Sequence, residues 1–262
     1  RIWDHDMTPL SSPPAPEPVQ LLPGQGFSGL VQVAGVLDAD EARMFVECGA
    51  TCLGFPLRLD THTPDTSEEE AARIIAGLPA HVTPLLITYE SDPGRLVDLA
   101  RFLGTAHVQF HADPEPETSA ALLARIRNLA PDLFLIKSLI MNHPDKDAFA
   151  VMQALAPLVD AFILDSFEPG TGALGATGNT HDWDLSRKMV ELSPKPVILA
   201  GGLNPDNVAR AVRQVRPAGV DAHTGLEDDS GRKDRDKVQD FITRAQEEMA
   251  RVPASPRPAH GS

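Results

Sequence analysis

Short apolar segments alternate with longer amphipathic segments along most of the chain. The short segments are apolar at both odd and even positions, a pattern typical of parallel strands that are buried on both faces. They predict eight strands, at residues 30–35, 50–55, 83–89, 106–111, 132–137, 160–165, 196–201 and 217–222.

The longer segments repeat apolar residues at the spacing of an amphipathic helix, and several begin with capping residues. Asp38 and Ser67 are each followed three residues later by glutamate, as in a capping box. Asn204 precedes a proline at the first helical position. Helices are therefore predicted at residues 38–49, 67–77, 91–103, 115–130, 145–156, 182–193, 204–215 and 233–250.

Eight strand–helix pairs in succession predict a single closed (β/α)8 TIM barrel of the α/β class. We assign residues 29–252 to the barrel, residues 1–28 to a proline-rich, extended N-terminal tail and residues 253–262 to a C-terminal tail. An open doubly wound sheet is the alternative. No G-x-G-x-x-G motif follows the first strand, which disfavours that alternative.

The charge balance restricts the partners of this barrel. The 262 residues include 23 basic and 37 acidic side chains, a net charge of −14, which argues against binding to nucleic acid. No apolar run approaches the roughly 20 residues that span a bilayer, and no signal peptide is visible. Cys48 and Cys52 lack a metal-type spacing and are expected to pack in a reducing compartment. We therefore expect a cytoplasmic monomer or homodimer without a membrane partner.

In TIM barrels the functional residues lie at the carboxyl ends of the strands. Gly201 and Gly202 follow the seventh predicted strand, and Thr224 and Gly225 follow the eighth. Glycine lets backbone N–H groups approach an anion, so these loops predict a site for the phosphate of a small-molecule substrate. Tight turns without a ligand are the alternative interpretation.

Asp165 closes the otherwise apolar segment "AFILD". Burial at a strand end raises the pKa of a carboxyl group and suits it to general acid catalysis near neutral pH. The alternative is an aspartate that caps the following loop.

Several motifs resemble one known family. The segments "ILDS…GATGNTHDW", "VILAGGLNPDNV" and "TGLED" resemble phosphoribosylanthranilate isomerase, a (β/α)8 enzyme of tryptophan biosynthesis. The segments "VQFHAD" and "CGATCLGF" extend the resemblance, which covers residue 30 to about residue 248.

The resemblance implies an Amadori rearrangement that converts a phosphorylated aminoaldose to an aminoketose, with no metal or cofactor. It implies that Asp165 protonates the ring oxygen as the general acid. It also implies that the phosphate binds at Gly201, Gly202, Thr224 and Gly225, with Gly178 in a loop that closes over the substrate.

One departure from the family concerns the general base. The family's first strand reads K-I-C-G and its cysteine removes the proton from C2, whereas this chain has Ala34 at that position. Histidines that follow alternate strands are candidates for the missing base, together with two glutamates: His62, His111, His181, His223, Glu90 and Glu227. We assign His223, which stands where the family has serine, and His62 as the catalytic partners of Asp165.

A second departure lies in the loop after the second strand, where the family has an arginine. Pro64 falls nearest to that position, and Arg58 lies six residues upstream. Two other functions therefore stay open. One is a barrel acting on another sugar phosphate as an epimerase, lyase or isomerase, with the histidines and Asp60, Asp65 or Glu90 around a metal ion. The other is a protein that binds a phosphorylated ligand without converting it.

Overall fold

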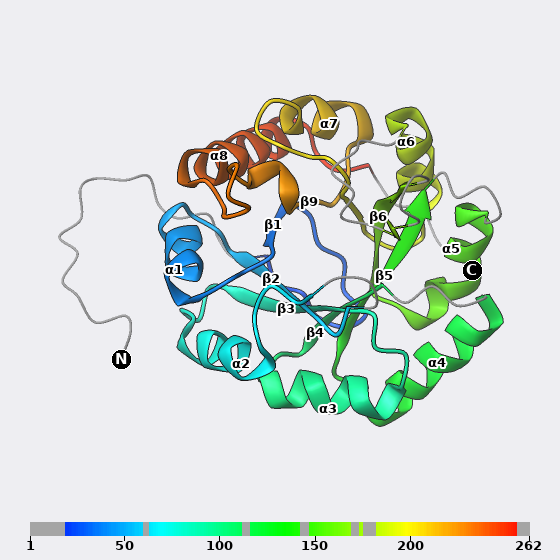
Figure 1. The fold of residues 1–262 in the computed structure, drawn as a ribbon. Coiled ribbons are helices and arrows are strands. Elements are labelled where there is room, and N and C mark those ends of the chain that lie inside the picture. The colour runs from blue at the N-terminus through cyan, green and yellow to red at the C-terminus, as the bar shows by residue number, and fades with distance from the viewer. Residues whose placement is uncertain are drawn as a thin grey trace.

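Eight parallel strands close into a barrel with helices on its outside (Figure 1). The computed structural model describes residues 19–59, 63–111, 116–141, 147–168, 173–174 and 182–255. Each strand pairs with the strand that follows it in the barrel, and β9 pairs with β1 to complete the ring. The strands are β1 (Leu30–Ala34), β2 (Cys52–Leu57), β3 (Thr83–Thr88), β4 (His107–Phe110), β5 (Phe134–Met141), β6 (Ala161–Glu168), β8 (Val197–Leu199) and β9 (Gly219–Ala222).

A helix follows each strand of the barrel, which confirms the predicted β/α alternation. The helices are α1 (Ala39–Glu47), α2 (Glu68–Gly77), α3 (Pro93–Leu103), α4 (Pro116–Leu129), α5 (Ala148–Leu155), α6 (Trp183–Leu192), α7 (Val208–Val215) and α8 (Arg235–Arg251). Two short 3-10 helices, η1 (Ala156–Leu158) and η2 (Thr224–Leu226), and the short strand β7 (Ala173–Leu174) complete the described elements.

The apolar side chains form two clusters, because alternate residues of each strand face opposite sides of the sheet. One cluster fills the space between the strands and the helices. The other lies inside the barrel and includes Ala34, Ile163 and Ala200. The alternation that buries Ala161 and Ile163 in the interior also directs Asp165 inward, at the end of the barrel where β6 leaves this cluster.

The predicted caps at Asp38 and Ser67 are confirmed, but the predicted cap at Asn204 is wrong. Asp38 accepts a hydrogen bond from the backbone N–H of Glu41, and Ser67 accepts one from that of Glu70. Asn204 instead accepts bonds from the N–H groups of Asp206 and Asn207, so it stabilises a turn, and α7 begins at Val208. An asparagine side chain bonds its own following backbone as readily in a turn as at a helix start.

Three strands extend beyond their predicted ends. β2 continues to Leu57, β5 continues to Met141, and β6 continues past Asp165 to Glu168, where it pairs with β7 in antiparallel orientation. Asp165 therefore lies within a strand and not at its last residue. Its backbone is held in the sheet by β5, with Ile140 opposite Asp165 in the register.

The amino-terminal end of the barrel is covered by the residues that precede β1. Of the segment assigned to the N-terminal tail, the structure describes residues 19–28, which contain no helix or strand. Leu21 is buried in the interior cluster, and Val19 and Phe27 pack against it. Within the described part of the chain, no helix has both the length and the apolar character that a membrane span requires.

Candidate active site at the carboxyl ends of the strands

A pocket of about 450 Å³ opens at the carboxyl end of the barrel. Its walls come from the ends of β1, β2, β3, β4, β6, β8 and β9 and from the loops that follow them. Six of the eight residues assigned from the sequence line it together: Asp165, Gly201, Gly202, His223, Thr224 and Gly225. The remaining two assigned residues, His62 and Gly178, lie outside the described residues.

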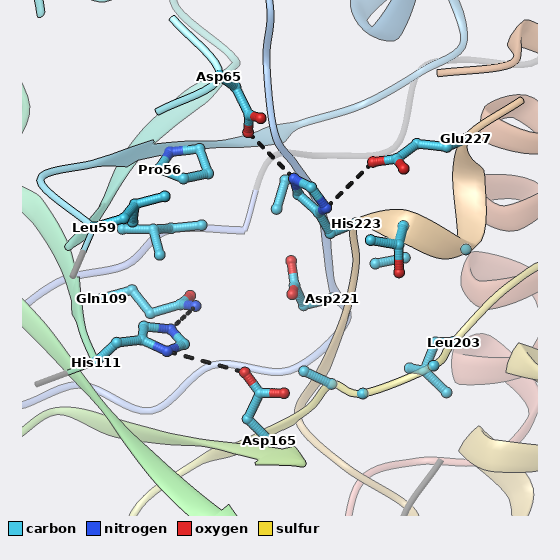
Figure 2. A pocket seen from close by; sticks show the side chains of 18 of the residues that line it. Pro56, Leu59, Asp65, Gln109, His111, Asp165, Leu203, Asp221, His223 and Glu227 are labelled. Atoms are coloured by element: carbon cyan, nitrogen blue, oxygen red, sulfur yellow. Dashed lines mark hydrogen bonds and ion pairs between the residues drawn. The ribbon is translucent and has the colours of Figure 1, made fainter. Parts of the chain in front are cut away.

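Asp165 and His111 face each other across the pocket floor (Figure 2). Both are buried, and His111 Nδ1 lies 3.9 Å from Asp165 Oδ2. Burial, with a further contribution from the charge of Lys137, lowers the pKa of His111 to about 3. His111 is therefore neutral at physiological pH, so this contact is not an ion pair and His111 is poorly suited to accept a proton.

A chain of amide hydrogen bonds orients the His111 ring. Gln32 on β1 donates through Nε2 to Gln109 Oε1 at 3.1 Å, and Gln109 Nε2 lies 2.7 Å from His111 Nε2. Because the His111 ring is neutral, Nε2 accepts from the Gln109 amide and the ring proton sits on Nδ1. His111 Nδ1 lies near Asp165 but makes no hydrogen bond to it.

The ring of His223 lies between two carboxylates (Figure 2). His223 Nε2 is 3.3 Å from Asp65 Oδ2, within hydrogen-bond range. His223 Nδ1 is 3.4 Å from Glu227 Oε1, but the geometry does not make a hydrogen bond, so this contact is electrostatic. Glu227 is held from its other side by Lys233, whose Nζ donates to the same Oε1 at 2.9 Å.

The His223 ring also lies directly against the end of β1. Gly35 follows Ala34 and has a φ of 85°. A Cβ atom placed on Gly35 would come within 2.1 Å of His223 Nε2. The imidazole therefore occupies space next to the end of β1, beside Gly35 and Ala34.

The loops after β8 and β9 pack tightly against each other. Gly201 and Gly202 have φ values of 86° and 64°, which favour glycine. A Cβ on Gly225 would lie 2.0 Å from the carbonyl oxygen of Leu203, so only glycine fits there. The side chain of Asn207 donates to the Gly202 carbonyl at 2.9 Å and fixes the first loop. The two loops thus present small residues and backbone to one side of the pocket.

Arg58 and Glu90, both candidates from the sequence, do not line this pocket. Arg58 donates from Nε to Glu68 at 2.8 Å and from Nη1 to Glu90 at 3.2 Å. Arg95 pairs with Glu90 as well. Burial by itself would raise the pKa of Glu90, but the Asp92 N–H and the two arginines lower it below its usual value. Glu90 is thus a neutralised structural carboxylate.

Sequence reasoning missed one buried carboxyl group, Asp221 on β9. Asp221 lines the pocket between Asp165 and His223 (Figure 2) and is 8% exposed. Burial, followed by the negative charge of Asp165, raises its pKa to about 8, and the charge of Lys233 opposes the rise. The available signal was the spacing of two residues to His223, which places both side chains on one face of the strand.

The described pocket lining holds four acidic side chains, Asp65, Asp165, Asp221 and Glu227, and no lysine or arginine. Among the residues that the structure describes, no group of three or more histidine, cysteine, aspartate or glutamate side chains is arranged to hold a metal ion. Cys48 and Cys52 are both buried as free thiols. Proton transfer between carboxyl and imidazole groups is the chemistry that this arrangement offers.

Comparison with known proteins points to one family. The family model for N-(5'-phosphoribosyl)anthranilate (PRA) isomerase matches residues 31–244. The chain is 35% identical over 226 residues to "N-(5'-phosphoribosyl)anthranilate isomerase 2" of Methanosarcina mazei, covering 85% of this chain and 96% of the relative. It is 36% identical over 216 residues to the enzyme of Haloferax volcanii, covering 82% and 92%.

Solved structures agree with the sequence relatives. The phosphoribosylanthranilate isomerase of Thermotoga maritima superimposes with a TM-score of 0.67 at 28% identity, covering 83% of this chain and 98% of that chain. A second isomerase structure, in complex with reduced 1-(o-carboxyphenylamino)-1-deoxyribulose 5-phosphate, gives a TM-score of 0.61 at 26% identity with the same coverage. The chain belongs to the phosphoribosylanthranilate isomerase family.

Proposed function

We propose that this protein is a phosphoribosylanthranilate isomerase in which an imidazole replaces the thiol base of its family. The substrate is N-(5'-phosphoribosyl)anthranilate, and the reaction is an internal aldose-to-ketose conversion. The family match and the relatives' names support the reaction. The contact between His223 and Gly35, next to Ala34, is the observation that supports the new base.

Asp165 supplies the first proton. Its carboxyl group protonates the ring oxygen of the ribose, the C1–O bond breaks, and the nitrogen lone pair forms a C=N bond at C1. Burial of Asp165 in the pocket floor supports this role, because an acid in a site with little water transfers its proton to substrate and not to solvent. The neutral His111 ring lies beside the carboxyl group, with His111 Nδ1 3.9 Å from Asp165 Oδ2.

His223 removes the proton from C2, the electron pair of that C–H bond forms the C1=C2 double bond of an enolamine, and the electron pair of the C=N bond returns to nitrogen. The enolamine then becomes the ketone by moving one proton from the C2 hydroxyl to C1. The proton that His223 took returns through solvent to Asp165, so that the substrate is isomerised and both side chains are restored. His223 lines the pocket, and Asp65, the present partner of its Nε2, belongs to a loop and not to a strand. Substrate must therefore take the place of Asp65 at Nε2, while Glu227 on the Nδ1 side stabilises the imidazolium that forms.

The phosphate of the substrate binds to the loops after β8 and β9. Backbone N–H groups around Gly201, Gly202, Thr224 and Gly225 are the donors that an acidic pocket lining leaves available for an anion. His62 and Gly178 stay predictions for the base and for the loop over the substrate. The phosphate at one side of the pocket and Asp165 at its floor set the orientation of the sugar between them.

Steady-state kinetics with N-(5'-phosphoribosyl)anthranilate test this function. We expect D165N and H223A each to lower kcat/KM by roughly 10²- to 10⁴-fold, the usual contribution of a general acid or base. The double variant A34C/H223A returns the thiol of the family to β1 and should recover much of the H223A loss. H81A, which removes an exposed histidine away from the pocket, is the matched control.

Two results would contradict the proposal in different ways. A folded wild-type protein that leaves the substrate unconverted refutes the isomerase function. A wild-type protein that is active while H223A keeps its full rate refutes only the base assignment, and H62A is then the next variant to measure.

A further inference from the structure

Asp221 has the properties of a ligand-binding group. Its side chain is more than nine-tenths buried, it lines the pocket, and its Oδ1 atom has no hydrogen-bond partner within the described part of the chain. A buried polar atom without a hydrogen-bond partner destabilises the folded protein, so such atoms are rare unless a ligand satisfies them. In Figure 2 the carboxyl group of Asp221 points into the pocket between His223 and Asp165.

The groups around Asp221 favour its uncharged form. Asp165 on β6 faces it, and whenever the Asp165 carboxyl group is ionised its charge opposes the loss of the Asp221 proton; the Cys52 thiol on β2 is also near it. Gln32, its neighbour on β1, is neutral. Lys233 is the cation that acts on Asp221, but its ammonium group is already paired with Glu227. Burial and the charge of Asp165 together raise the pKa of Asp221 to about 8.

The position of Asp221 determines which part of a ligand it meets. Asp221 lies on β9, two residues before His223 and three before Thr224. Its carboxyl group is therefore deeper in the barrel than the loops assigned to the phosphate. Asp165, assigned to the ring oxygen, is on its other side (Figure 2). The sugar carbons and their hydroxyl groups occupy the space between those two points. A charged carboxylate there would repel a phosphate dianion, whereas a neutral carboxyl group would not.

We propose that Asp221 binds the substrate as a neutral carboxylic acid whose O–H group donates a hydrogen bond to a hydroxyl oxygen of the sugar. This inference rests on the proposed function, because that function supplies the sugar phosphate. It assigns Asp221 a contact with substrate that differs from the acid role of Asp165 and the base role of His223. Loss of the proton above about pH 8 removes the donor and adds a negative charge, so both effects weaken binding.

Equilibrium binding of the reduced product analogue, 1-(o-carboxyphenylamino)-1-deoxyribulose 5-phosphate in reduced form, measures this contact without turnover. Calorimetric titrations are made between pH 7 and 9.5, where the phosphate stays doubly charged. Wild-type affinity should fall by up to about tenfold per pH unit above pH 8. D221N, an uncharged donor of the same shape, should bind within a few-fold of wild type at pH 7 and change little with pH. D221A should bind at least tenfold more weakly at pH 7.

Two results overturn the inference. One is a D221N variant that binds at least tenfold more weakly than wild type at pH 7, because that shows that the negative charge is needed. The other is a parallel decline of wild type and D221N with pH. A carbon-13 NMR titration of the Asp221 carboxyl, assigned by its absence in D221N, decides the protonation state independently of any ligand. If the Asp221 carboxyl group titrates below pH 6, it is not a neutral acid at pH 7, and the inference is wrong even if the protein is an active isomerase. The isomerase function itself is tested separately by the turnover assays.

Discussion

Two residues at the pocket, Ala34 and His223, are the basis of the proposed change of base. In the proposal, His223 takes the role that the resemblance assigns to a cysteine at the position of Ala34. They belong to β1 and to the residue after β9, which are adjacent strands of the closed barrel. The imidazole reaches the end of β1 because Gly35 leaves room for it. We therefore propose that a base on either of these two adjacent strands can act at the same substrate carbon.

The variant G35A tests whether the space beside Gly35, which the His223 ring occupies, is needed for activity. A methyl group on Gly35 overlaps His223 Nε2, so the ring must move, and we expect kcat/KM to fall more than tenfold. Because Gly35 has a φ of 85°, the change also strains the backbone by about 1–2 kcal/mol. G29A is the matched control, since Gly29 has a φ of 81° and open space around its Cβ position. Equal losses of stability with equal activity in both variants would show that the ring position is unimportant.

At the scale of elements, the two ends of each strand have separate tasks. β6 begins after Asp160, which is buried at the amino-terminal end of the barrel, and includes Asp165 near the pocket. Asp160 accepts hydrogen bonds from the backbone N–H groups of Gly24 and Leu135, both at 2.8 Å, and it pairs with Arg127. It thereby ties the segment before β1 to β5 and α4. Contacts at the amino-terminal end of the barrel stabilise the fold, whereas the pocket lies at the carboxyl end.

D160A should therefore destabilise the protein without altering catalysis. The change leaves two backbone N–H groups without their acceptor and removes one of the three acceptors of the mostly buried Arg127 guanidinium. We expect a loss of about 3 kcal/mol in the free energy of unfolding. Urea denaturation and kcat/KM measured on the same samples check this. D160N retains one acceptor oxygen and should lose less. A fall in kcat/KM under conditions where D160A is fully folded would contradict the separation of the two ends.

At the scale of the whole molecule, an acidic protein holds an acidic pocket for an anionic substrate. The net charge is −14, and the described lining offers carboxyl, imidazole and backbone N–H groups. In the proposed binding mode, two features allow an anion to bind in this acidic pocket. The buried carboxyl group of Asp221 stays uncharged, and the glycine-containing loops after β8 and β9 line the pocket. Burying that carboxyl group has a cost that depends on pH.

The stability of the wild-type protein should fall, relative to D221N, as pH rises from about 4 to about 8. The unfolded chain releases the Asp221 proton near its ordinary pKa of 3.8, whereas the folded protein retains it until about pH 8. Between these values the folded state binds more protons, so each rise in pH favours unfolding. Urea midpoints of wild type and D221N at pH 4.5, 6, 7 and 8 measure the difference. D98N, which changes an exposed aspartate of α3, should stay parallel to wild type.

A constant difference between wild type and D221N over this range would mean that Asp221 is ionised in the folded protein. The pH dependence expected here is opposite in sign to that of Glu90. The pKa of Glu90 is lowered, so its contribution to stability is lost as pH falls through that lowered value.

The sequence alone was enough to predict the order of strands and helices, the barrel and the positions of Asp165, Gly201 and Gly225, because hydrophobic periodicity and glycine loops are local properties. The start of α7 was wrong, since Asn204 suits a turn as well as a cap. The contacts of His223 and Asp221 depend on the closure of the barrel. It placed His223 against Gly35 and beside Asp65, which is 158 positions away, and it enclosed Asp221 next to Asp165. Burial and electrostatic coupling depend on distances between strands that are remote in the chain, and no local pattern encodes those distances.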